Sequence, residues 1–340
     1  MDKLVWILIG VLALGLLVGL SFSREFTTSI SGSLGELDES VSVSVEKLSL
    51  AEMAKLTLQD TWVYYRPKDV PKVFAQQVLQ ALVRSRQVVT EALGIELVPT
   101  GAVLLKGREP RNKVFWLDAA STFVVWVPEE EMQASLEQAS AQTLEQIYWV
   151  VTHEATESTI SRMLYRYDPG TRWVGDGLAE YAGYLASKTF AQQAQQLRMG
   201  SLIRRIERLL ESGMQDYDLV EHFQAIRVES KLGLLEGIGL MLGFNREALV
   251  RMAVERVRLQ AQDPVIIAGY AVALAFWLWI AQEHGVGIIK TFLRELQKMK
   301  EPTNDALFET LSKLTGQDLK QKVVQMDLAQ ALQILQAHRD

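Results

Sequence analysis

Apolar residues recur with two different periods along this chain, and the change of period divides it into two parts. Short β-branched and aromatic runs at 61–65, 102–105 and 122–127 lie close to glycine or proline and predict strands. A helix is predicted over 71–93, where apolar positions recur at spacings of three and four. After residue 129 the pattern is helical almost throughout, with helices predicted at 136–165, 177–210, 246–260, 265–283 and 286–298. This order predicts an α+β fold in which a small N-terminal sheet precedes a mainly helical half.

The segment 4–22 contains nineteen consecutive residues without a charge. A helix of that length crosses the roughly 30 Å of hydrocarbon in a bilayer, so we expect a single-pass transmembrane anchor. A cleaved signal peptide is the alternative, but its apolar core is shorter and ends at a small-x-small cleavage site. The flanking charges nearly cancel on both sides and orient the anchor weakly. We expect the soluble domain on the extracytoplasmic side of the membrane.

Three further regions follow the anchor. Residues 23–58 are rich in serine, threonine and glutamate, and they indicate a linker or stalk, or a peripheral strand, of which we favour the linker. An α+β subdomain is expected over 59–190 and a helical subdomain over 191–340. Within the latter, 265–281 is apolar enough to resemble a second membrane span. Its seventeen residues are short for a span, so a buried core helix is the better interpretation.

Composition excludes several classes of function. The formal net charge is −6 and no long run of lysine or arginine occurs, so nucleic acid is not an expected partner. The chain has no cysteine, which excludes disulfides, thiolate metal sites and a cysteine nucleophile. Any metal site must therefore use histidine and carboxylates.

The helix predicted near residue 150 carries the sequence His153-Glu154-Ala155-Thr156-Glu157. Side chains four residues apart lie on one face of a helix, so His153 and Glu157 could hold one ion between them. Glu154 is then placed to act as a general base towards water that the ion polarises. Taken alone, this short pattern could equally be an ordinary polar helix face.

A second motif, Arg-Trp-Val-Gly-Asp-Gly-Leu-Ala-Glu-Tyr, follows at 172–181. Together the two motifs resemble the HExxH and W-x-x-E-G-[LF]-A-x-Y motifs of gluzincin metallopeptidases, notably the aminopeptidase-N-like catalytic domains of the peptidase MA-like superfamily. Eighteen residues separate Glu157 from Asp176, the same spacing as in that family. The resemblance implies a zincin-like domain, metal ligands at His153, Glu157 and Asp176, and hydrolysis of peptide bonds with Glu154 as the base.

The resemblance extends over about 62–326 and implies two further roles. Tyr270 opens an apolar helix like the one in which the family keeps a tyrosine that donates a hydrogen bond to the oxyanion. Glu180 lies one turn beyond Asp176, where related peptidases have a carboxylate that orients a ligand histidine. The family's Gly-x-Met-Glu-Asn strand is absent from the sequence, so aminopeptidase specificity is not implied. The strand at 122–127 could instead pair with an extended peptide.

The ligand set departs from the family at two positions, because Glu157 replaces a histidine and Asp176 replaces a glutamate. Two carboxylates neutralise a divalent ion and weaken its Lewis acidity. Oxygen-rich ligation favours manganese, ferrous iron or calcium, although His153 still suits zinc, the metal that the resemblance implies. Aspartate is also one methylene shorter than glutamate, so its helix must approach the ion more closely.

These departures leave different functions open. One is an active, membrane-anchored metallopeptidase. Another is a pseudoenzyme, that is, an inactive pseudopeptidase without metal. It would serve as a membrane-anchored binding or assembly subunit for a peptide or protein. A third is that the motifs coincide by chance in a helical membrane-associated protein.

Single residues have structural alternatives as well. Asp176 could cap the helix predicted from 177, and Tyr270 could be a core tyrosine with a local hydrogen bond. A surface or structural role is expected for His222, His284 and His338. Core packing, and not stacking on a cofactor, is expected for Trp277 and Trp279.

Overall fold

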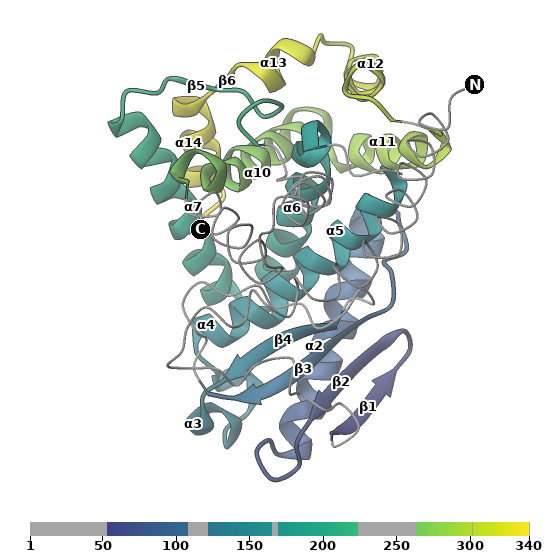
Figure 1. Ribbon diagram of the computed structural model, residues 1–340, viewed down its shortest axis with the longest axis vertical. Coiled ribbons are helices and arrows are strands. Elements are labelled where there is room, and N and C mark those ends of the chain that lie inside the picture. Colours follow the sequence, from purple (N-terminus) through teal and green to yellow (C-terminus); the bar gives the residue numbers. More distant parts are fainter. Residues whose placement is uncertain (1–52, 108–121, 165–168, 224–262, 301, 340) are drawn as a thin grey trace, which may run out of the picture. The chain divides into compact units, whose positions relative to one another are not determined.

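A computed structural model describes residues 53–107, 122–164, 169–223, 263–300 and 302–339, which all belong to one compact unit (Figure 1). The expected anchor at 4–22, most of the expected linker and the helix predicted at 246–260 lie outside these described residues. The unit is mixed α+β and mostly helical, with a small sheet in its N-terminal part. This architecture confirms the α+β class and the order of sheet and helices expected from the sequence.

Four strands form the sheet in the order β1-β2-β3-β4. A hairpin joins β1 (Ala54–Leu58) to the antiparallel β2 (Thr61–Tyr65) through a turn in which Gln59 has a positive φ of 52°. The strands β3 (Thr100–Lys106) and β4 (Thr122–Val127) continue the sheet in parallel with β2. The last five residues of the expected linker are therefore the peripheral strand β1, in which apolar and polar residues alternate.

Helix α2 (Lys72–Leu93) connects the parallel strands β2 and β3 and covers one face of the sheet. Parallel neighbours need such a crossover, because the chain must return to the starting edge. Apolar residues recur every three or four positions along the helix, and they pack against every second residue of the strands. The packed side chains include Phe74, Val78 and Leu82 from the helix and Val63, Ala102, Phe123 and Val125 from the strands.

The helix predicted at 136–165 is broken into several segments. After α3 (Glu129–Met132) and a short 3-10 helix, η3 (Leu136–Gln138), Ser140 caps α4 (Ala141–Leu144) by accepting the Thr143 N–H at 3.3 Å. A π-helical turn, η4 (Glu145–Val150), then leads without interruption into α5 (Val151–Met163). Such wide turns inside α-helices occur frequently at functional sites. The candidate ligand His153 lies in the first turn after this one.

The helix predicted at 177–210 is two helices. The first, α6, spans Arg172–Phe190 and begins five residues earlier than expected, whereas α7 spans Gln192–Glu211. Ala191 separates them with an extended φ of −151°. The first helix crosses α5 and α10 closely, while the second packs on α10 and α14.

Helix α10 (Pro264–His284) begins with a favourable cap, because Asp263 accepts the Val265 N–H at 2.8 Å and proline occupies the first turn. Among the described residues it alone is long and apolar enough to cross a membrane, by length and composition. Of its most apolar 18-residue window, 61% is buried within the protein. It packs against α6, α7 and α14, which is the setting of a core helix.

Short helices complete the C-terminal part. They are α11 (Val286–Lys298), α12 (Asn304–Thr315), α13 (Lys320–Val324) and α14 (Leu328–Ala337). A two-stranded sheet pairs β5 (Asp216–Tyr217) with β6 (Met326–Asp327) and ties this part to the chain after α7. The helix α11 was predicted from the sequence with the same bounds.

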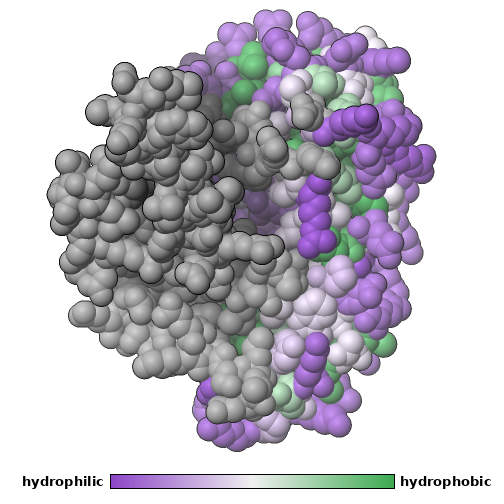
Figure 2. Space-filling view, turned by 45° about the vertical axis from the view of Figure 1, so that its right-hand side comes forward, coloured by the Kyte–Doolittle hydropathy of each residue, from purple (hydrophilic) through white to green (hydrophobic). Residues whose placement is uncertain are grey.

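The visible described surface in Figure 2 is largely polar, with apolar residues scattered over it. Within the described residues, the exposed large apolar side chains are Leu58, Val73 and Leu197, from three different elements. Isolated apolar residues of this kind are normal on a soluble surface.

Candidate metal centre

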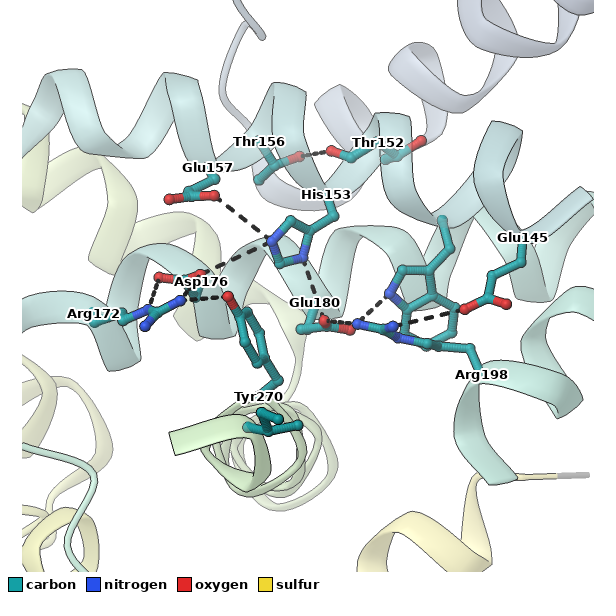
Figure 3. Close-up of polar contacts among 12 residues, drawn as sticks. Glu145, Thr152, His153, Thr156, Glu157, Arg172, Asp176, Glu180, Arg198 and Tyr270 are labelled. Atoms are coloured by element: carbon teal, nitrogen blue, oxygen red, sulfur yellow. Dashed lines mark hydrogen bonds and ion pairs between the residues drawn. The ribbon is translucent and has the colours of Figure 1, made fainter. Parts of the chain in front are cut away.

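Helices α5 and α6 bring four polar side chains together in the interior (Figure 3). His153 Nε2 lies 3.7 Å from Glu157 Oε2 on its own helix and 4.0 Å from Asp176 Oδ1 on the neighbouring one. On the opposite side of the ring, His153 Nδ1 lies 3.5 Å from Glu180 Oε1. His153, Asp176 and Glu180 are buried, and Glu157 is partly buried. The predicted site residues from both motifs thus converge.

The geometry of His153, Glu157 and Asp176 suits one small cation. One ligand atom from each of the three residues lies within 4.8 Å of the other two. Two ligands that are each about 2.0 to 2.2 Å from one ion are separated by roughly 3 to 4 Å. The two distances from His153, 3.7 and 4.0 Å, fall in that range. The shorter aspartate therefore still reaches the cluster.

Asp176 does not cap a helix. Helix α6 begins at Arg172 with Thr171 in the capping position, so Asp176 lies in the second turn with its side chain 2% exposed. The capping interpretation is wrong because the helix starts before the two glycines that flank Asp176. A buried carboxylate inside a helix needs partners other than helix-terminal amides. Here those partners are Arg172 and His153.

Arg172 and Tyr270 close one side of the cluster. Arg172 Nε donates to Asp176 Oδ2 at 2.9 Å, and its guanidinium also donates to the Tyr270 hydroxyl. The guanidinium lies over the rings of Phe223 and Tyr270, 4.5 and 5.0 Å from their centroids. The second oxygen, Asp176 Oδ1, accepts a longer bond from Arg172 Nη2 at 3.5 Å and also faces His153 Nε2 at 4.0 Å. The Tyr270 hydroxyl on α10 therefore accepts a hydrogen bond from Arg172 on α6, and not from a residue nearby in the sequence.

Glu180 is held from two sides beneath His153. Trp149 Nε1 donates to Glu180 Oε2 at 2.7 Å, and Arg198 from α7 forms an ion pair with Glu180 Oε1. Burial alone would raise the pKa of Glu180, but the charges of Arg198 and His153 lower it below its usual value. The carboxylate is consequently ionised and faces His153 Nδ1. Within the described part of the chain that nitrogen makes no hydrogen bond, so the 3.5 Å contact is an ion-pair contact.

The cluster changes the pKa values of its own members. Burial would lower the pKa of His153, but the carboxylates of Glu157, Glu180 and Glu154 raise it to about 9. Burial raises the pKa of Asp176 to about 6, helped by Glu157 and opposed by Arg172 and His153. Without an ion, His153 is therefore a cation surrounded by carboxylates.

Glu154 and Tyr270 belong to the same electrostatic environment. Burial raises the pKa of Tyr270, with Arg172 opposing and the carboxylates of Asp176, Glu157 and Glu154 adding to it. The phenol therefore keeps its proton at neutral pH and can donate it in a hydrogen bond. Its ring centroid lies 5.9 Å from that of His153. Tyr270 therefore lies beside His153, and the charge of Glu154 raises the pKa of both residues.

Sequence reasoning missed Trp149, Arg172 and Arg198. Arg172 had a usable signal, because it precedes Asp176 by four residues and opposite charges at this spacing pair on a helix. Trp149 and Arg198 had none, since their contacts with Glu180 depend on the π-helical turn and on how α7 packs.

The other histidines and tryptophans take no part in this cluster. His222 and His338 contact backbone oxygens of Asp218 and Ile334 on their own segments. Trp279 packs edge-on to His284. Trp277 is fully buried and stacks on Trp173 with a centroid distance of 6.1 Å. These contacts are structural.

No protein-family model matches this chain, and no curated protein matches it significantly in sequence. The function must therefore be argued from the site.

Proposed function

We propose that this protein is a membrane-anchored, gluzincin-like metallopeptidase that hydrolyses peptide bonds at a divalent metal centre. The observation that carries the proposal is the convergence of His153, Glu157 and Asp176, whose ligand atoms lie within 4.8 Å of one another in a buried site. Three protein ligands would leave the fourth position of a tetrahedral ion for water or a substrate, as in catalytic metal sites. Zinc is the metal that the resemblance implies, with manganese or ferrous iron as alternatives suited to two carboxylate ligands.

Each residue of the site would have a separate role in hydrolysis. When bound, the ion supplies Lewis acidity to a carbonyl and to water. Glu154 follows the ligand His153 in the sequence and would accept the proton of the attacking water. Tyr270 keeps its proton and would donate a hydrogen bond to the developing oxyanion. Glu180 faces the second nitrogen of His153 and would hold its orientation.

The peptide class of substrate is supported by β4, the last strand in the order of the described sheet. An extended peptide could add to such an edge by main-chain hydrogen bonds. At Trp126 the backbone groups of this edge already have partners. The Gln146 side chain accepts from the Trp126 N–H at 2.9 Å and donates to the Trp126 carbonyl at 3.3 Å. Backbone groups two residues apart point to the same side of a strand. The backbone groups of Thr122 and Val124 lie on that same side, and because both residues are buried, a peptide would pair with them only after this edge opens.

The membrane part of the proposal rests on the uncharged segment 4–22, whose length suits a single span. The described domain would then lie on the extracytoplasmic side, and its substrates would be peptides or proteins there.

A second candidate is supported by a specific observation, the ion pair between Arg172 and Asp176. Together with a protonated His153 it balances the charges of Glu157 and Asp176 without any metal. In that case the protein would be a pseudopeptidase that binds a peptide or protein partner as a membrane-anchored subunit. The absence of a metal from the purified protein would favour this candidate.

The Glu154→Gln variant tests the catalytic assignment. Because the amide keeps the shape but cannot accept a proton, peptide hydrolysis should fall by about 10² to 10⁴ or more. Metal content should stay at the wild-type level, since Glu154 is not a ligand. Hydrolysis of a peptide library and metal content are measured on the full-length protein in mild detergent. Retained hydrolysis would overturn the assignment of Glu154.

A further inference from the structure

Behind the candidate metal centre lies a second buried group of charges, formed by Glu145, Arg198 and Glu180 (Figure 3). Arg198 comes from α7, which carries none of the proposed ligands. Its guanidinium pairs with Glu180 Oε1 and lies 3.7 Å from Glu145 Oε1. Glu180 is fully buried, whereas the side chains of Arg198 and Glu145 are 19% exposed. A charged group this deep needs a compensating partner.

Trp149 completes the group. Its indole N–H donates to the second oxygen of Glu180 at 2.7 Å, and its ring lies 5.8 Å from the Arg198 guanidinium. A side chain at Gly183 would overlap this indole, since an added Cβ would come within 2.6 Å of Trp149 Cδ1. The tryptophan thus lies directly on the backbone of α6. Both carboxylate oxygens of Glu180 are therefore fixed by donors from other elements.

We propose that Arg198, with Trp149, is a positioning residue for the metal ligand His153, acting through Glu180. The inference rests on the proposed function. With Oε2 bonded to the indole and Oε1 to the guanidinium, the carboxylate cannot rotate away from His153 Nδ1, 3.5 Å distant. The ring then presents Nε2 to Glu157 and Asp176. Glu145 supports the arginine from η4, the π-helical turn that leads into α5.

Metal affinity tests the inference, because outer partners of a ligand histidine affect affinity by about 10- to 100-fold. The full-length protein in mild detergent is titrated with Co²⁺ against a chromophoric chelator, and the visible spectrum of the bound Co²⁺ is recorded. Arg198→Met should weaken binding about 10- to 100-fold and change the spectrum. Arg198→Lys should recover part of the affinity, since it restores the charge but not the planar fork.

Arg205→Met is the matched control. Arg205 lies two turns further along α7, is also partly buried, and donates to the Ile267 carbonyl at 3.3 Å. Its charge also lowers the pKa of Glu180, but it does not hydrogen-bond that carboxylate. Its loss should therefore reduce thermal stability about as much as that of Arg198, yet change the Co²⁺ affinity much less and leave the spectrum unchanged. If Arg198→Met does not fold, Arg198→Lys and Glu145→Gln decide, because both should weaken Co²⁺ binding to a smaller degree.

The outcomes separate the two proposals. If the wild type binds Co²⁺ and all Arg198 and Glu145 variants bind it equally well, the positioning role is overturned while the metal centre stands. The same holds if Arg205→Met weakens binding as much as Arg198→Met. If the wild type binds no Co²⁺, the metal centre itself is overturned and the positioning role with it.

Discussion

His153 is subject to two opposing requirements. As a metal ligand it must be neutral, yet the carboxylates around it raise its pKa to about 9 in the metal-free protein. At pH 7 the free site therefore holds a proton where the ion would bind. Metal binding must displace that proton, and this links affinity to pH.

We expect binding of Zn²⁺ at pH 7 to release about one proton per ion. Affinity should rise about tenfold per pH unit from 7 towards 9, the pKa of His153, because the proton competes less. Below about 6, the pKa of Asp176, a second proton competes and the dependence steepens. Calorimetry in two buffers with different ionisation enthalpies measures the release. A value of zero at pH 7 would show that His153 is neutral before binding.

At the level of single residues, the sequence was sufficient for the members of the candidate site and insufficient for what holds them. His153 and Glu157 were paired by their spacing, because helical periodicity determines which side chains share a face. Asp176 and Glu180 were identified only through the resemblance of 172–181 to a family motif. Trp149 and Arg198 act on Glu180 from elements far away in sequence. Such contacts depend on helix packing, which local patterns do not specify.

Helices α6 and α10 cross in close contact at the centre. Trp277 lies on Gly177, and its indole N–H donates to the Trp173 carbonyl at 3.1 Å. A Cβ at Gly177 would come within 2.7 Å of Trp277 Nε1 and 3.1 Å of Ala273 Cβ. The absence of a side chain at this position lets α10 bring Tyr270 towards Arg172 and Asp176.

Gly177→Ala should destabilise the protein by about 1 to 3 kcal/mol, because an added methyl overpacks the contact with Trp277. Gly175→Ala is the matched control on the same helix, where a Cβ would meet only Leu164 Cδ1 at an ordinary 3.7 Å. It should be neutral or stabilise by up to about 1 kcal/mol through helix propensity. Chemical denaturation measures both. Equal stability of the two variants would contradict the close crossing.

At the level of elements, the regular periods predicted β2, β4, α2 and α11 almost to the residue. The interruptions within the predicted helices were not predicted from the sequence. The π-helical turn before α5 has no distinct period, and the interruption at Ala191 involves neither glycine nor proline. The strand β1 is short and became recognisable only through its pairing with β2.

Within the described unit, two apolar clusters flank the polar centre. One contains the sheet and α2, and the other contains the C-terminal helices with most of α6. The segment 145–163 contributes to both, since Ile147 and Val151 pack in the first cluster and Ala155 and Ile160 in the second. A buried group of charges between two apolar clusters is costly unless fully paired. An ion bound by three of these side chains would provide such pairing.

Metal content of the purified full-length protein is the most direct test of this account. Plasma mass spectrometry is applied to the wild type, to His153→Ala, and to His222→Ala as a control histidine outside the cluster. We predict one bound transition ion per chain in the wild type and in His222→Ala, and none in His153→Ala. A wild type that holds no ion after loading with zinc or manganese would contradict the metal centre and favour the pseudopeptidase.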